Sequence, residues 1–261
     1  MTNVLHRTMR PNLVPLTRHQ CVPLLRFHPN MLGVPNLHTL QNCPIFQSFQ
    51  HLPDDPYLSQ NPDHPTRQRR YAKYEIKVRD PHTYDIRATD NSVFEQNVSD
   101  SRGAPRPFER IQDNILHHEW LLAFITQTSA LAHLQECHKN DICLIKSPLK
   151  TITVDVHQVR QICYPGLGSH NSPEGIHRDG ADYIVSAFVV NRVNVQGGET
   201  IVYDEEYNEV FHDKLLKGEG MFQEDRTQLH YVEPISPLKA RDPESLGLGV
   251  RDIFGLDITL H

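Results

Sequence analysis

Two histidines and one aspartate have the residue types and the spacing of a mononuclear metal site. His177 and Asp179 are separated by one residue, in a segment that follows the turn-forming residues 172–175. If this segment is extended, both side chains point to the same face, because side chains alternate along a strand. His230 ends a strand-like stretch that begins at Met221. Two imidazoles and one carboxylate would leave half of the coordination sphere of a ferrous ion open to other ligands.

The open positions of such a site could take a 2-oxo acid. Its C1 carboxylate and keto oxygen would occupy two positions and leave the third to dioxygen, and its far carboxylate would then need a cation. Arg251 opens the last apolar run of the chain, and a guanidinium binds a carboxylate with two parallel hydrogen bonds. We therefore predict that Arg251 binds the co-substrate. Arg241 is the alternative, but the prolines and glycines around it are typical of a loop.

Three further residues are candidates for binding a substrate. Arg192 follows an apolar run and Tyr164 precedes a Pro-Gly turn, and a role at a strand end is the simpler interpretation of both. Arg70 forms a small basic cluster with Arg67 and Arg69. Most such clusters are solvated, but one of these arginines could bind a substrate carboxylate. We name Arg192, Tyr164 and Arg70 as the candidates.

From residue 151 onward the chain is rich in β-forming residues. Runs with this character cover residues 151–164, 181–190, 199–204, 220–232 and 250–260, and segments rich in Gly, Pro and Asn separate them. No helical pattern lies between the runs, which favours an antiparallel sandwich or barrel. We predict a mainly β protein with flanking helices, folded as a double-stranded β-helix, that is, a cupin-like jelly roll.

The first part of the chain has a different character. Residues 1–70 hold ten of the nineteen prolines, so we predict an irregular arm there, with room for short strands. Aromatic and β-branched residues predict a strand over residues 71–79. The predicted organisation is thus a proline-rich arm, residues 1–70, followed by a jelly-roll domain, residues 71–261.

A helix is expected between the first strand and the β-rich part. Pro107 suits a first helical position, and apolar residues from Phe108 to Ile125 follow at helical spacing. We predict a long amphipathic helix over about residues 107–137, which would support the jelly roll from one side. The polar residues from Thr126 onward leave a break in this helix open.

Charge and composition argue against several classes of protein. The net charge of −6 comes from interspersed acids and bases and offers no broad positive surface to a nucleic acid. No apolar run reaches the eighteen or so residues that would cross a bilayer, and no secretory signal is evident at the start. Five irregularly spaced cysteines argue against a disulfide framework. We expect a cytoplasmic protein with no nucleic-acid or membrane partner, and leave a homodimer open.

A second metal site is the weaker interpretation of another cluster. His133, Cys137, His138 and Cys143 lie close together in the sequence. Their spacing fits no standard zinc pattern, and the first three fall on the predicted helix. Structural or solvated roles are the simpler expectation for them.

Several motifs together resemble the bacterial 2-oxoglutarate/Fe(II) dioxygenases that hydroxylate free L-amino acids, such as isoleucine 4-hydroxylase. The resembling segments are PEGIHRDG at 173–180, VNRVNVQGGET at 190–200, HYVEPI at 230–235 and RDI at 251–253. The resemblance implies a double-stranded β-helix, iron ligands at His177, Asp179 and His230, and a co-substrate arginine at Arg251. The stretch from His230 to Arg251 is longer than the family pattern, which leaves the choice of arginine less secure.

The implied activity is oxidation of an aliphatic carbon with Fe(II), 2-oxoglutarate and O2. We expect a free L-amino acid or a related small carboxylate as the substrate. Two alternatives stay open at this point. The same chemistry could act on a peptide, a carrier-bound residue or a natural-product intermediate, or the jelly roll could be a metal-binding or small-molecule-binding module without enzymatic activity.

Overall fold

The computed structural model describes residues 6–19, 22–40, 43–58, 64–96, 98, 103–238 and 247–261. The strands in this part of the chain are β1 (His6–Met9), β2 (Leu24–Phe27), β3 (Arg67–Asp80), β4 (Thr83–Ala88), β5 (Val93–Phe94), β6 (Arg106–Pro107), β7 (Thr151–Cys163), β8 (Tyr183–Val193), β9 (Val195–Gly197), β10 (Glu199–Tyr203), β11 (Glu209–Lys214), β12 (Gly220–Glu224), β13 (Leu229–Val232), β14 (Ile235–Pro237) and β15 (Gly249–Leu260). The α-helices are α1 (Leu13–Leu16), α2 (Pro44–Ser48), α3 (Asp113–Leu116) and α4 (Glu119–Lys139). Short 3-10 turns are η1 (Thr17–His19), η2 (Pro29–Leu32), η3 (Leu37–Thr39), η4 (Phe49–His51) and η6 (Leu144–Lys146).

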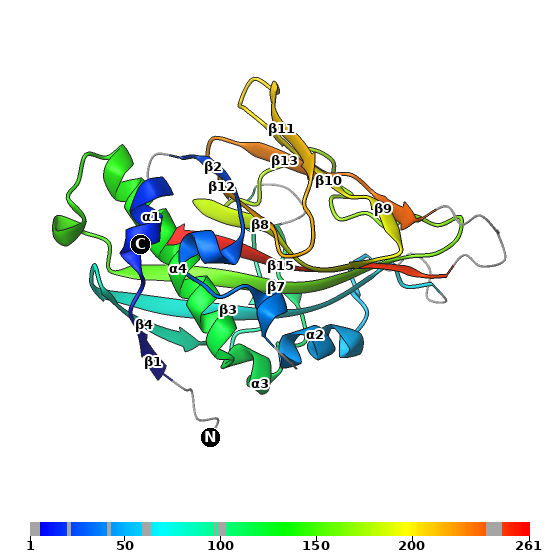
Figure 1. Ribbon diagram of the computed structural model, residues 1–261, viewed down its shortest axis with the longest axis horizontal. Coiled ribbons are helices and arrows are strands. Elements are labelled where there is room, and N and C mark those ends of the chain that lie inside the picture. Colours follow the sequence, from blue (N-terminus) through cyan, green and yellow to red (C-terminus); the bar gives the residue numbers. More distant parts are fainter. Residues whose placement is uncertain are drawn as a thin grey trace.

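One large sheet and a smaller one form the body of the protein. Among the described residues, the large sheet has the strand order β1-β4-β3-β7-β15-β8-β12-β2, and the smaller has the order β11-β10-β13. Every pairing within the two sheets is antiparallel. The smaller sheet lies to one side of the large one, and α4 crosses on the other side (Figure 1). The prediction of a mainly β jelly roll is confirmed.

The two faces of the large sheet differ in polarity because side chains alternate along each strand. On β7, Val154 and Val156 belong to the main apolar core, which also contains residues of α4. The intervening residues of β7 include Asp155 and His157, which are buried polar groups. The apolar face therefore holds the helix, while the polar face is turned toward the interior of the jelly roll.

The β-rich runs predicted from the sequence are strands, with one exception. The stretch at 220–232 is two strands, β12 and β13, that belong to different sheets. The turn between them contains Asp225, which is fully buried and accepts three backbone hydrogen bonds. A local pattern of β-forming residues does not show where a chain passes from one sheet to another.

The helical prediction was wrong at its start. Pro107 lies in β6, and helical structure begins only at α3 and continues after a short break in α4. The His118 side chain caps α4 by accepting a hydrogen bond from the backbone N–H of Trp120. No break occurs near Thr126, and Thr128 donates its hydroxyl proton to the carbonyl of Phe124 within the helix.

The proline-rich arm contains short elements that pack on the large sheet and on α4. β1 pairs with β4, and β2 pairs with β12. Gln127 of α4 donates to the carbonyl of Leu32, and Gln135 donates to the carbonyls of His19 and Val22. The predicted strand at 71–79 extends further in both directions as β3, so the boundary expected at residue 70 falls inside a strand.

In the described part of the chain, none of the helices combines the length and the apolar character needed to cross a membrane. Cys43, Cys137, Cys143 and Cys163 are free thiols.

Candidate metal centre

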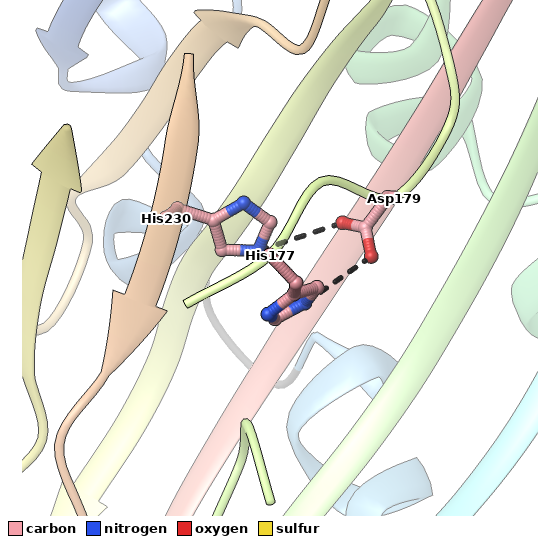
Figure 2. Close-up of side chains that lie close together, drawn as sticks. All are labelled: His177, Asp179 and His230. Atoms are coloured by element: carbon pink, nitrogen blue, oxygen red, sulfur yellow. Dashed lines mark ion pairs between the residues drawn. The ribbon is translucent and has the colours of Figure 1, made fainter. Parts of the chain in front are cut away.

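His177, Asp179 and His230 converge on one point (Figure 2). One potential ligand atom from each side chain lies within 4.8 Å of the others. His177 and His230 are joined by an isolated antiparallel bridge, in which the backbone N–H of each donates to the carbonyl of the other at 3.0 and 2.8 Å. The segment of His177 and Asp179 is therefore not the strand considered in the sequence, but one bridge fixes it against β13.

The ring of His177 is oriented by its own backbone. Its Nδ1 lies 2.8 Å from the carbonyl oxygen of Gly175, which can only accept, so Nδ1 carries a proton. In the neutral imidazole this leaves a lone pair on Nε2, the atom that faces Asp179 at 3.5 Å. Gly175 has a φ of +85°, a conformation that glycine adopts without strain. The local turn thus presents a nitrogen ligand to the centre.

Asp179 is held by a neighbouring buried carboxyl group. Asp225 is fully buried and accepts hydrogen bonds from the backbone N–H groups of Asp179, Gly180 and Ala181, at 3.1, 2.7 and 3.1 Å. Burial raises the pKa of Asp225 to about 7, and the charge of Asp179 adds to this. The sequence analysis missed this contact, since nothing local connects residue 225 with residue 179.

The electrostatics of the three groups favour a positive charge between them. Burial opposes protonation of His177, but hydrogen bonds and charges of Asp179 and Glu174 outweigh it and raise its pKa to about 10. Burial also opposes ionisation of Asp179, yet His230 and His177 hold the pKa of Asp179 below its usual range. Two imidazole nitrogens and one carboxylate on one side of a point fit a divalent metal with open positions on its other side.

The centre lies in a cavity of about 400 Å³ that contains both apolar and charged side chains. A volume of this order is at the small end of those that bind small molecules. The apolar part includes Val159, Val185 and Ile253, while Arg67, Arg69 and Arg106 line the same cavity.

Comparison with protein families identifies the family of this protein. A family model described as 2OG-Fe dioxygenase matches residues 46–257. The chain belongs to the 2OG-Fe dioxygenase family. It is therefore an enzyme, a 2-oxoglutarate-dependent dioxygenase whose cofactors are Fe(II), 2-oxoglutarate and O2, and the non-enzymatic alternative is wrong.

Solved structures share the fold of this dioxygenase. A bsmA homologue from Methylobium petroleophilum PM1 is 20% identical, with a TM-score of 0.73 over 94% of this chain and 91% of that one. IDO from Bacillus thuringiensis is 18% identical, with a TM-score of 0.67 over 95% and 98%. The Fe(II)/α-ketoglutarate-dependent dioxygenase TqaL is 15% identical, with a TM-score of 0.61 over 94% and 84%. At these identities the likeness concerns the fold alone. No curated protein sequence matches the dioxygenase.

Arg251 lies in a row of polar side chains that crosses four strands of the large sheet. Arg67 on β3 pairs with Gln161 on β7, Gln161 with Arg251 on β15, and Arg251 with Arg192 on β8. Arg251 is fully buried, and its Nη1 donates to the Gln161 Oε1 at 3.0 Å. Within the described residues, its Nε and Nη2 have no hydrogen-bond partner. Such a group fits the far carboxylate of 2-oxoglutarate.

The other residues named from the sequence have different surroundings. Arg192 is next to Arg251, and its Nη2 donates to the carbonyl of Gly197 at 2.6 Å. Tyr164 donates its hydroxyl proton to the carbonyl of Pro65 and is not part of the cavity lining described above. Arg70 points to the other face of β3, where it pairs with Glu109. Arg241 lies outside the described residues.

The choice of Arg70 as the cavity residue of its cluster was wrong. Side chains alternate along β3, so Arg67 and Arg69 point to the interior and Arg70 points away from it.

The sequence analysis also missed Gln96. Its Nε2 donates to the Asp179 Oδ1 at 3.1 Å, and its Oε1 accepts from Arg106. No motif in the sequence marks this glutamine. The contacts of His133 agree with the structural role expected for it, since its two nitrogens contact the hydroxyls of Tyr84 and Ser147.

Proposed function

We propose that the dioxygenase hydroxylates an aliphatic carbon of a free L-amino acid or a related small carboxylate. In this proposal His177, Asp179 and His230 hold the iron, and Arg251 binds the far carboxylate of 2-oxoglutarate. The motif resemblance to hydroxylases of free L-amino acids supports the substrate class. The observation that carries the proposal is the cavity of about 400 Å³ beside the three candidate ligands, which has room for a small molecule.

Each group of residues has one task in this activity. The carbonyl of Gly175 keeps the Nδ1 of His177 protonated and its Nε2 available as a ligand, and Asp225 fixes the turn that carries Asp179. The bound Fe(II) and 2-oxoglutarate would supply the oxidising chemistry that inserts one atom of O2 into a C–H bond. Arg251 orients the co-substrate by binding its far end.

The cavity walls hold the substrate and exclude water from it. Val159, Val185 and Ile253 offer an apolar surface on which an aliphatic chain can pack near the centre. Positioning of the reacting carbon is itself a large contribution to rate, because it removes the entropy of bringing the partners together.

Succinate formation tests the proposal. The purified protein with Fe(II), ascorbate and 2-oxoglutarate is offered each proteinogenic L-amino acid, and succinate and the mass of the product are measured. At least one amino acid should stimulate succinate formation and gain 16 mass units, and His177→Ala should reduce both signals to background. If none does so while succinate still forms slowly without substrate, the family chemistry holds and the substrate class is wrong.

The same mass measurement separates the alternatives that remain. A gain of mass on an added peptide or carrier-bound residue, with no product from free amino acids, would favour the other substrates considered above. A cytoplasmic location, a homodimer and the absence of nucleic-acid and membrane partners stay predictions from the sequence.

A further inference from the structure

The cavity beside the metal centre has a cationic wall. Arg67 and Arg69 are alternate residues of β3, so both side chains point to the interior. Arg106 comes from β6 and lines the same cavity. Three guanidinium groups from two separate segments therefore face the space next to the metal ligands.

Among the described residues, Asp55 is the acid that contacts Arg67 and Arg69. Asp55 is fully buried and accepts from the Nε of Arg67 at 2.7 Å, and it lies 3.9 Å from the Nη1 of Arg69. Burial lowers the pKa of Arg69 to about 9, and the positive charge of Arg67 is the next cause. Burial and Arg67 likewise lower the pKa of Arg106. The cluster therefore gains if an anion binds to it.

The other acids that line the described part of the cavity contact groups outside the arginine cluster. Asp257 lies 3.0 Å from the Nε2 of His157, and burial raises its pKa well above the usual range, so it adds little negative charge. Glu174 lies 3.0 Å from the Nε2 of His177, and Asp179 lies 3.5 Å from the same atom. Both carboxylates thus contact the candidate ligand His177.

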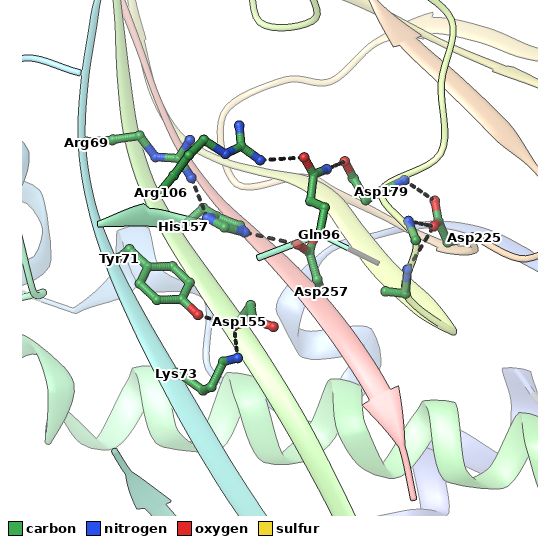
Figure 3. A network of polar contacts seen from close by, with 12 residues as sticks. Arg69, Tyr71, Lys73, Gln96, Arg106, Asp155, His157, Asp179, Asp225 and Asp257 are labelled. Carbon is green, nitrogen blue, oxygen red and sulfur yellow. Dashed lines mark hydrogen bonds and ion pairs between the residues drawn. The ribbon is translucent and has the colours of Figure 1, made fainter. Parts of the chain in front are cut away.

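Arg69 is held in place by groups that do not neutralise it. Its guanidinium lies 4.1 Å from the centroid of the Phe108 ring, and its Nη2 bonds to the Nδ1 of His157. His157 is in turn bonded to Asp257, so a chain of contacts runs from Arg69 into the sheet (Figure 3). A group fixed in this way loses little conformational entropy when an anion binds.

Arg106 connects the cationic wall with the metal centre. Its Nη2 donates to Gln96, and Gln96 donates to Asp179, as Figure 3 shows. A single amide side chain thus separates Arg106 from a metal ligand. An acid bound at Arg106 would have its nearby carbons close to the centre, beside the apolar surface of Val159, Val185 and Ile253.

We infer that Arg67 and Arg106, with the added charge of Arg69, bind the carboxylate of the substrate. The dioxygenase therefore takes small aliphatic acids with the acidic group on this wall and the chain on the apolar wall. The inference rests on the proposed function in one respect, namely that the bound acid is the molecule that the enzyme oxidises. Binding itself is tested without turnover, so the two can fail separately.

The test uses the protein loaded with Fe(II) and 2-oxoglutarate under anaerobic conditions, which prevents oxidation and fills the co-substrate site. Isothermal titration calorimetry compares isovalerate with isovaleramide, which has the same shape and no charge. The wild type should bind isovalerate at least about 10-fold more tightly than the amide, since a hydrogen bond to a charged group contributes about 1.5–3 kcal/mol.

Substitutions at Arg106 and Arg70 test whether isovalerate binds to the arginine cluster. Arg106→Gln should lose about 10-fold or more in isovalerate affinity, and Arg106→Lys should lose less because it keeps the charge. Arg70→Gln, on the same strand but on the other face, is the matched control and should bind as the wild type does. Circular dichroism checks that each variant is folded.

Equal binding of acid and amide by the wild type would overturn the inference. So would an Arg106→Gln variant that is folded and binds isovalerate as Arg70→Gln does. If isovalerate binds as expected but no amino acid supports turnover, the carboxylate site stands and the proposed substrate class fails.

Discussion

Two buried arginines on the same face of the large sheet, Arg251 and Arg69, have very different surroundings. Burial lowers the pKa of each to about 9, and a neighbouring arginine adds to this, Arg192 in one case and Arg67 in the other. Both stay cationic at neutral pH. Arg69 is bonded to His157 and stacked on an aromatic ring, whereas Arg251 donates to the neutral Gln161.

The difference separates a guanidinium held by a histidine and an aromatic ring from one that donates to a single neutral amide. Among the described residues, one nitrogen of Arg69, Nε, lacks a hydrogen-bond partner, against two in Arg251, Nε and Nη2. A buried cation with unused donors destabilises the protein unless an anion binds it. Among the described residues, Arg251 has two such donors, Nε and Nη2, and in the proposed function 2-oxoglutarate would supply the anion. Arg69 contributes to the structure of the cavity wall as well as to its charge. Substitutions at the two positions should therefore have different effects on function and on stability.

The largest effect is expected on co-substrate binding. Arg251→Leu should raise the KM for 2-oxoglutarate by about 100-fold or more, since removing one partner of a buried charge pair costs about 2–5 kcal/mol. Arg251→Lys should lie between this variant and the wild type, because it keeps the charge but loses the two-pronged geometry. Succinate formation against 2-oxoglutarate concentration measures this. An unchanged KM in Arg251→Leu would assign the co-substrate to another cation.

Stability should change in opposite directions at the two positions. Arg69→Leu leaves the buried Nδ1 of His157 without its hydrogen-bond donor, which should cost about 1–3 kcal/mol and lower the melting temperature by several degrees. Arg251→Leu replaces an uncompensated buried charge with an apolar group and should stabilise the protein by about 1 kcal/mol or more. Thermal unfolding with a chelator and without 2-oxoglutarate gives the comparison. Equal losses at both positions would remove the distinction.

The cationic wall should also make stability depend on pH through His157. Burial and then the charge of Arg69 lower its pKa well below the usual value, and Arg106 and Arg67 add to this. The unfolded chain takes up a proton near pH 6.5 that the folded protein does not. The stability linked to His157 is therefore complete above about pH 6.5 and is lost as the pH falls below it.

His157→Gln isolates this contribution, because glutamine can still bond to Arg69 and to Asp257. Between pH 6.5 and 5.5, the wild type should lose about 1 kcal/mol more unfolding free energy than the variant. Denaturant unfolding at these two pH values and at pH 7.5 provides the measurement. Parallel pH profiles for the two proteins would show that folding does not shift the pKa of His157.

The smallest effect is expected at Arg192. It pairs with Arg251 in the sheet, but one of its nitrogens already donates to the carbonyl of Gly197. Arg192→Gln should raise the KM for 2-oxoglutarate by less than about 10-fold. The substitution removes a positive charge at longer range, but it removes no direct bidentate contact with the co-substrate. A loss as large as that in Arg251→Leu would instead make Arg192 a second direct ligand of the co-substrate.

Local patterns in the sequence were sufficient to predict most of the strands and to select the three candidate ligands of the centre. The runs that became β7, β8, β10 and β15 are rich in β-forming residues, and such a preference is local. Pro107 misled the helical prediction, because a residue that suits the first turn of a helix also suits an edge strand, and only pairing with β5 decides between them.

By itself, the sequence determined the jelly-roll class and supplied His177, Asp179 and His230 as candidate ligands, because β preference and ligand types can be read from short segments. The bridge that brings His177 to His230 forms only in the folded chain. Only the tertiary structure decided which arginines face that site. Arg67 lies in one row with Gln161 and Arg251 because of the register of three strands that are far apart in the chain. Register depends on long-range pairing, and a shift of one residue would turn Arg70 inward instead.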